Sequence, residues 1–360
     1  MASFRSAAGR GTFPDECVAA WVKLVYNQLQ AMENMDQDRR KVVARKILLA
    51  VDGTEKGLES VSVLGRLLKD QPDLELVLFH CVQQLSSLLP SDLCVDLEDR
   101  CKISFKDQER IGNAVLSESV KRLVQAGFPE DRIVPKLKMN SMDPAQDIIA
   151  EADSRKIRTI ALGRRGRSQV EALLLGSVSG KVAQYAQHKT VWIVDAPVNE
   201  TGKVLIAMED APESRELTAY AAEFVAPSRR MRFTFLHLMP PVPPTFWDNG
   251  HILGSAERKD RQSRIEKWRS EWMDRVSKFM SDGKELLQRQ GTPGTNLDTL
   301  VLPTKLGIAR DLLNEIAEHQ FQMVIMGKKS FHERKPFLMG SHASKVMQNV
   351  KCVVLCLVDY

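Results

Sequence analysis

Two glycine-rich segments with matching spacing are the residues of this chain best suited to ligand chemistry. In the first segment, Gly163 and Gly166 are followed, nine residues further on, by the pair Gly176 and Ser177. The two glycines allow the main chain to approach a ligand closely. A Gly-Ser pair at the start of a helix offers free N–H groups, a hydroxyl and the positive end of the helix dipole. This combination is suited to binding a phosphate group.

The second segment repeats the first, and the repeat extends well beyond it. The segment 327–341 has the same spacing, with Ser330 in place of the second glycine. The segment 46–52 also resembles 203–209 at an offset of 157 residues, whereas the glycine segments are offset by 164 residues. A chain of 360 residues that contains such a duplication is expected to form two domains.

Each half of the duplication is expected to alternate strands and helices. Short apolar runs rich in Val, Ile and Leu alternate with segments whose apolar residues recur every three or four positions. This order predicts an α/β fold with two tandem five-stranded parallel sheets of the Rossmann-like type, joined by right-handed crossovers. The predicted strands are 46–51, 74–82, 133–138, 157–162 and 190–195, then 203–208, 231–239, 297–302, 322–326 and 351–358.

The expected domains are 46–197 and 203–360, preceded by an N-terminal tail and helix in residues 1–45. The seven residues gained by the second half fall in the charged segment 256–290. Residues 13–45 show an apolar helix face, which is typical either of a helix packed on a domain or of a docking helix for a partner. Both interpretations stay open.

Composition argues against several classes of protein. The net charge of +5 is modest, and no basic run contains interleaved aromatic residues, so nucleic-acid binding is not expected. No apolar run reaches the ~20 residues that a membrane-spanning helix needs, and the N-terminus lacks an apolar signal core. The six cysteines show no metal-binding spacing. We therefore expect a cytoplasmic protein in a reducing compartment.

The candidate ligand site lies where the predicted strands end. Asp52 ends the first strand, Val82 the second, and Gly163 follows the fourth. Ligands of open parallel sheets bind beyond the carboxyl ends of the strands, so these residues converge if the first and fourth strands are neighbours. Asp52 would then accept hydrogen bonds from a base or a ribose hydroxyl, and the main chain near Val82 would pair with an adenine edge. The amides of Gly176, Ser177 and Val178 would face phosphate oxygens, and arginines 164, 165 and 167 would add charge unless they face solvent.

The pattern G-x2-G-x9-G-[S/T], with an aspartate ending the first strand, resembles the ATP-binding signature of the universal stress protein family. The resemblance covers nearly all of residues 46–360 as two tandem domains. It implies a fold like that of the adenine-nucleotide alpha hydrolases, ATP or a related adenine nucleotide as ligand, with or without Mg²⁺, and pairing of domains through their last strands. The two halves would form a dimer within one chain, and a further homodimer stays open. The residues implied to bind the nucleotide are Ala50, Asp52, Val82, Gly163, Gly166, Gly176, Ser177 and Val178.

The second half departs from this pattern at three positions. Glu209 replaces the aspartate, Ser330 replaces the second glycine, and His342 stands where the first half has Val178. These changes predict weaker or absent nucleotide binding in the second half. Lys328 and Lys329 could compensate, so a second occupied site stays open.

Other chemistries find little support in the sequence. His80 and His237 share one position of the repeat but have no second ligand nearby, so no metal site is expected. No catalytic triad or carboxylate pair has local support, and the most that we expect of an enzyme here is slow ATP hydrolysis near Asp52. The alternative function is a nucleotide-independent interaction scaffold that uses 13–45 and 256–290 as surfaces for an unknown protein partner.

Overall fold

The computed structural model describes residues 45–83, 105–164, 176–212, 214–226, 230–246, 254–329 and 339–359. Gly166, Ser330 and the predicted helix within 13–45 lie outside these residues. Within them, no helix is long and apolar enough to cross a membrane.

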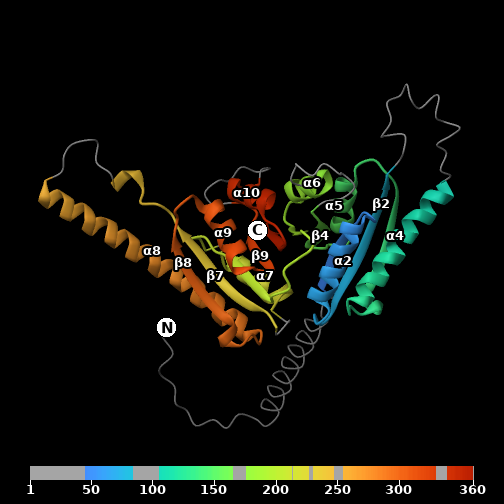
Figure 1. The fold of residues 1–360 in the computed structure, drawn as a ribbon, viewed down its shortest axis with the longest axis horizontal. Coiled ribbons are helices and arrows are strands. Elements are labelled where there is room, and N and C mark those ends of the chain that lie inside the picture. The colour runs from blue at the N-terminus through green and yellow to red at the C-terminus, as the bar shows by residue number, and fades with distance from the viewer. Residues whose placement is uncertain are drawn as a thin grey trace, which may run out of the picture. The chain divides into compact units, whose positions relative to one another are not determined.

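The first half contains five strands and four longer helices among its described residues (Figure 1). They follow the predicted alternation of strand and helix. In chain order they are β1 (Arg45–Val51), α2 (Glu55–Leu68), β2 (Leu74–Gln83), α4 (Phe105–Gln125), β3 (Ile133–Ser141), α5 (Pro144–Ser154), β4 (Thr159–Gly163), α6 (Ser177–Tyr185) and β5 (Thr190–Val194).

The second half repeats this order, as a duplication requires. Its helix α8 has 35 residues against 21 in α4, so the expansion predicted for 256–290 lengthens a helix. The elements are β6 (Lys203–Ala207), α7 (Ser214–Phe224), β7 (Arg232–Met239), α8 (Ser255–Arg289), β8 (Leu297–Pro303), α9 (Ile308–His319), β9 (Met323–Gly327), α10 (Ser341–Asn349) and β10 (Val354–Val358).

The two five-stranded sheets join edge to edge into one ten-stranded sheet. Its strand order is β3-β2-β1-β4-β5-β10-β9-β6-β7-β8. The strands within each half pair in parallel. At the junction β5 and β10 pair in antiparallel fashion, with Val194 opposite Val354 and Val191 opposite Leu357. The carboxyl end of β5 therefore lies beside the amino end of β10, and the carboxyl ends of the two sets of strands point to opposite edges of the sheet.

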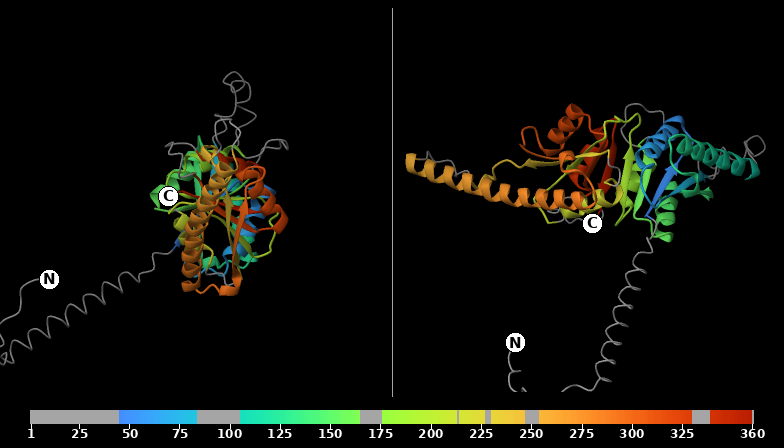
Figure 2. Two further views of the ribbon diagram at one scale, coloured as in Figure 1. Left: turned by 90° about the vertical axis from the view of Figure 1, so that its left-hand side faces the viewer. Right: turned by 90° about the horizontal axis from the view of Figure 1, so that it is seen from below.

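Helices cover both faces of this sheet (Figure 2), and an apolar core lies between the sheet and the helices on each face. Successive strand residues face opposite sides, so Ile47 and Leu49 enter one core and Leu48 the other. The first core takes in α2, α4, α7 and α8, and the second takes in α5, α6, α9 and α10. Because both faces are covered, central strands such as β5 and β10 are largely apolar and are buried along their whole length. The edge strands β3 and β8 also carry exposed polar residues.

Candidate functional site

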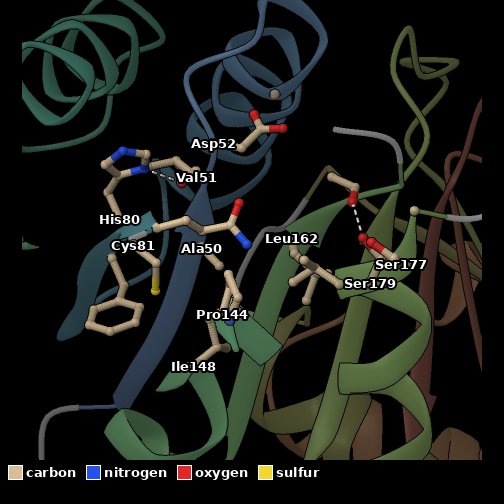
Figure 3. A pocket seen from close by; sticks show the side chains of 16 residues that line it. Ala50, Val51, Asp52, His80, Cys81, Pro144, Ile148, Leu162, Ser177 and Ser179 are labelled. Atoms are coloured by element: carbon tan, nitrogen blue, oxygen red, sulfur yellow. Dashed lines mark hydrogen bonds between the residues drawn. The ribbon is translucent and has the colours of Figure 1, made fainter. Parts of the chain in front are cut away.

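A cavity of about 220 Å³ lies at the carboxyl ends of β1, β2 and β4. We call it the first pocket. Its position follows from the pairing of β1 with β4, in which Ala50 lies opposite Leu162. Figure 3 shows Asp52 on one side of the pocket and Ser177 and Ser179 of α6 on the other. The lining residues are Ala50, Val51, Asp52, Gly57, Phe79, His80, Cys81, Gln83, Pro144, Ile148, Leu162, Gly163, Gly176, Ser177, Val178 and Ser179.

Most of the residues singled out by the sequence meet in this pocket. Those that line it are Ala50, Asp52, Gly163, Gly176, Ser177 and Val178. Val82 does not line it; its side chain approaches Gly112 of α4, where a Cβ would lie 2.9 Å from Val82 Cγ2. The neighbours of Val82, Cys81 and Gln83, do line the pocket. Gly166 lies outside the described residues.

Asp52 is held against the start of helix α2. Its Oδ1 accepts hydrogen bonds from the amide and the hydroxyl of Thr54 at 3.0 and 2.8 Å. Thr54 is the N-cap of α2, and its hydroxyl accepts from the amide of Gly57 at 3.1 Å. A Cβ at Gly57 would lie 2.3 Å from Asp52 Oδ1, so only glycine leaves room for this arrangement. Sequence reasoning missed Gly57, although a glycine three residues after an N-cap threonine is a readable signal.

The start of helix α6 forms the opposite side of the pocket. Gly176 is its N-cap and has no side-chain cap, and the Gly176 amide donates to the main-chain oxygen of Arg164 at 2.9 Å. The Ser179 hydroxyl donates to the main-chain oxygen of Gly163 at 2.7 Å. These two bonds join the start of α6 to the end of β4, which keeps the first amides of the helix directed at the pocket. Such amides have no partner within their own helix and favour an anion.

The remaining walls combine apolar side chains with the polar groups of His80 and Cys81. Phe79, Ile148 and Leu162 offer an apolar surface. His80 Nδ1 lies 2.7 Å from the main-chain oxygen of Val51, which fixes the ring at the end of β2. Burial, together with the nearby Asp147 carboxylate, raises the pKa of the Cys81 thiol to about 12. The thiol therefore stays protonated near neutral pH and is no nucleophile.

The described residues contain no group of three or more His, Cys, Asp or Glu side chains that could hold a metal ion. Asp52 is the one carboxylate among the described residues that line the first pocket. One carboxylate is enough for Mg²⁺ only where substrate phosphates supply further ligands.

The second half has a pocket at the equivalent place, which we call the second pocket. It has a volume of about 260 Å³ and lies at the carboxyl ends of β6, β7 and β9. Where the first pocket has Cys81 and Gln83, this one has Leu238 and Pro240, so one wall loses its polar groups. The full lining is Ala207, Met208, Glu209, Asp210, Leu236, His237, Leu238, Pro240, Trp272, Ile308, Leu312, Met326, Gly327 and His342.

The second pocket also has a wall residue from the longer helix α8, Trp272, whereas no described residue of α4 lines the first pocket. The Trp272 indole Nε1 donates to His237 Nε2 at 2.9 Å, while His237 Nδ1 lies 2.9 Å from the main-chain oxygen of Met208. This pair of bonds fits the neutral ring with its proton on Nδ1. Arg275 lies over the Trp272 ring, 5.4 Å from its centre, and forms an ion pair with Asp210 at 2.8 Å.

The fold is that of a tandem α/β protein, and in the described part of each half a pocket lies at the carboxyl ends of the strands. The profile of the Universal stress protein family matches residues 44–195 and 200–357, and the chain belongs to this family.

One curated relative and two solved structures illustrate what the chain is similar to. The universal stress protein YxiE of Bacillus subtilis (strain 168) is 26% identical over 148 residues, which cover 39% of this chain and 91% of that protein. A universal stress protein from Archaeoglobus fulgidus DSM 4304 covers 88% of this chain and 99% of its own length, with 17% identity and a TM-score of 0.56. A universal stress protein solved in complex with cAMP covers 42% of this chain and 96% of its own length, with 21% identity and a TM-score of 0.30.

Proposed function

We propose that the first half binds an adenine nucleotide, with ATP as the first candidate, as a structural or regulatory ligand. The observation that carries this proposal is the meeting of Asp52 and the start of α6 on two sides of one pocket. One side offers a carboxylate that accepts hydrogen bonds, and the other offers helix amides that favour phosphate. The family resemblance of the glycine segment supports the same ligand.

The walls of the first pocket suit the parts of such a ligand. The apolar surface of Phe79, Ile148 and Leu162 suits the flat face of a base. Asp52 lies where it would accept a hydrogen bond from a hydroxyl or an amino group. The amides of Gly176, Ser177 and Val178 would hold phosphate oxygens, and the Ser177 hydroxyl would add a donor. If Mg²⁺ accompanies the nucleotide, Asp52 and the phosphates would hold it.

The ligand role of ATP is better supported than its hydrolysis. Among the described lining residues, Asp52 already accepts two hydrogen bonds from Thr54, and Cys81 is a neutral thiol. Neither side chain is therefore arranged as a general base that would take a proton from an attacking water. A slow ATPase would release phosphate from ATP, and the Asp52→Ala variant would abolish that release.

The test is to denature the purified protein, assay the supernatant for adenine nucleotides, and titrate the nucleotide-free protein with ATP by calorimetry. We expect a bound nucleotide and one binding event that the Asp52→Ala variant weakens by about tenfold or more. The matched control is Glu209→Ala, which changes the equivalent position of the second half and should leave this event unchanged. A protein that carries no nucleotide and shows neither heat of binding nor thermal shift with ATP would favour the interaction scaffold instead.

A further inference from the structure

The basic residue that follows the first glycine of each motif does not point into its own pocket. Arg164 follows Gly163, and Lys328 follows Gly327 at the equivalent position of the second half. From the sequence alone, a basic residue at this position is expected either to contact phosphate or to face solvent. In the structure the Arg164 and Lys328 side chains are only 3% and 1% exposed, and neither residue lines the first or the second pocket. Both side chains cross the junction between the halves.

Arg164 extends from the first half to helix α10 of the second. Its guanidinium donates to the main-chain oxygen of Gln348, near the carboxyl end of that helix. The same group lies 3.5 Å from Asp195 Oδ2, which also accepts a hydrogen bond from the amide of Cys352 at 3.1 Å. Arg164 thus connects the end of β4 to α10, the helix of the second half that is equivalent to α6.

Lys328 makes the reciprocal connection. Its ammonium group donates to the main-chain oxygen of Ala186, the residue that ends helix α6, at 2.6 Å. It also lies 3.4 Å from Asp359 Oδ2, and this oxygen accepts from the amide of His188 at 3.1 Å. Asp359 offsets part of the cost of burying the lysine, although burial still lowers the pKa of Lys328.

The helix that Lys328 holds is the one whose other end faces the first pocket. The last carbonyl groups of a helix lack partners within the helix, and a cation there also interacts favourably with the helix dipole. Helix α6 has only nine residues, so a contact at Ala186 constrains the amides of Ser177 and Val178 at its start. The main chain of Lys328 meanwhile accepts from the Gly340 amide at 2.9 Å, as Arg164 does from Gly176. In each half, the main-chain oxygen of this basic residue therefore accepts a hydrogen bond from the glycine before the next helix. Its side chain donates to a main-chain oxygen at the carboxyl end of the equivalent helix in the other half.

We infer that Lys328, a residue of the second half, is a positioning residue for the phosphate-binding amides of the first half. The inference rests on the proposed function of the first pocket. It means that affinity for the phosphates, but not for the base and ribose, depends on a contact made across the junction. A change in the second half would then alter nucleotide binding in the first without any ligand in the second pocket.

The test compares ATP with adenosine on the full-length chain. We expect Lys328→Met to lower the affinity for ATP by about fivefold or more, as befits loss of a charged helix contact, while the affinity for adenosine stays unchanged. Lys328→Arg, which keeps a cation at the site, should recover most of the ATP affinity. The matched control is Lys329→Met, because Lys329 pairs with the same Asp359 at 3.5 Å but its side chain is 31% exposed. Unchanged ATP binding in Lys328→Met, or an equal loss for ATP and adenosine, would overturn the inference.

A second measurement separates this inference from the proposed function. Hydrogen exchange of the α6 amides should be faster in Lys328→Met than in the parent chain, with α5 unaffected. If the parent chain binds neither ligand, the proposed function fails, whereas faster exchange in α6 still supports the contact across the junction. Unchanged exchange in α6 would show that the contact of Lys328 with Ala186 does not position this helix, whatever the protein binds. Should Lys328→Met not fold, Lys328→Gln, which keeps a donor for Ala186 but removes the charge, takes its place. We then expect smaller changes in the same directions, and an absence of change in either measurement would overturn the inference.

Discussion

The pockets of the two halves occupy equivalent places in one repeat but offer a ligand different surfaces. The first pocket has a carboxylate fixed by Thr54, a glycine at position 57 that makes room for it, and a serine that joins α6 to β4. In the second, Ser214 stands at the position of Gly57, and its hydroxyl forms hydrogen bonds with the main chain of Glu209 at 2.7 and 3.0 Å. Ala343 stands at the position of Ser179, and Trp272 supplies a wall. The duplication has kept the main-chain frame, whereas the polar groups have diverged.

The most sensitive point of this comparison is the glycine beside Asp52. The variant Gly57→Ser places in the first half the residue that the second half uses. Because any Cβ there would lie 2.3 Å from Asp52 Oδ1, the carboxylate must move. We expect the affinity for ATP to fall by about tenfold or more, which corresponds to about 1.4 kcal/mol, as measured by calorimetric titration.

Gly254→Ser is the matched control for this variant. Gly57 lies in the first turn of α2 and Gly254 is the N-cap of α8, but the nearest atom to a Cβ at Gly254 is Glu257 Oε2 at 3.5 Å, an ordinary contact. Its affinity for ATP should equal that of the parent chain. If Gly57→Ser binds ATP as tightly as the control, the placement of Asp52 does not distinguish the two pockets.

The aromatic wall of the second half gives the largest expected effect on the free energy of unfolding. Trp272→Phe removes the donor to His237 Nε2 and leaves that buried nitrogen without this hydrogen bond. We expect the free energy of unfolding to fall by about 1–3 kcal/mol, measured by denaturant titration. Trp268→Phe is the control, because the Trp268 ring packs against Trp272, with centres 5.3 Å apart, and takes no part in the bond to His237. Equal losses in the two variants would mean that the ring contacts matter and the hydrogen bond does not.

The pKa of the same histidine predicts how acid lowers the stability of the second half. Burial lowers the pKa of His237, while the Met208 carbonyl and Asp210 oppose the shift. The unfolded chain therefore takes up a proton near the usual histidine pKa of about 6.5, whereas the folded chain does so only at lower pH. Stability from the neutral ring is present above that value and is lost as the pH falls towards the folded pKa. Unfolding followed against pH should show this loss, and the His237→Gln variant should lack it.

Features set by neighbouring residues in the chain could be predicted from the sequence, whereas contacts between distant residues could not. The strands came within a few residues of their predicted bounds because apolar runs and glycines mark them. One exception is β10, which begins at Val354 rather than 351. Cys352 has a φ of 57°, and its amide donates a hydrogen bond to Asp195, which is 157 positions away in the chain. The direction of Arg164 and Lys328 was not predictable, because it depends on the pairing of β5 with β10. The contact of Trp272 with His237 likewise joins residues 35 positions apart.

A smaller effect is expected from the serine that joins α6 to β4. Ser179→Ala gives the first half the residue found at position 343 and removes the hydrogen bond to the Gly163 carbonyl. We expect a loss of about 0.5–1.5 kcal/mol in the free energy of unfolding, together with a modest loss of ATP affinity. Ser62→Ala is the control, since the Ser62 hydroxyl bonds only within α2, to the main-chain oxygen of Leu58 at 3.2 Å. ATP binding that responds equally to both variants would show that the link to β4 has no part in holding the amides of α6.

The smallest expected effect concerns the charges of the second pocket. Arg275 forms a two-pronged ion pair with Asp210, yet its side chain is 48% exposed, so water and salt screen the interaction. We expect Arg275→Ala to lower the free energy of unfolding by about 0.2–1 kcal/mol in low salt and by less in high salt. Arg289→Ala is the control on the same helix, because Arg289 pairs with Glu285 far from the pocket. If Arg275→Ala costs more than its control only in low salt, the ion pair contributes by charge. If the excess survives in high salt, packing of the guanidinium over Trp272 is the cause, and the second pocket then differs from the first in its aromatic wall rather than in its charges.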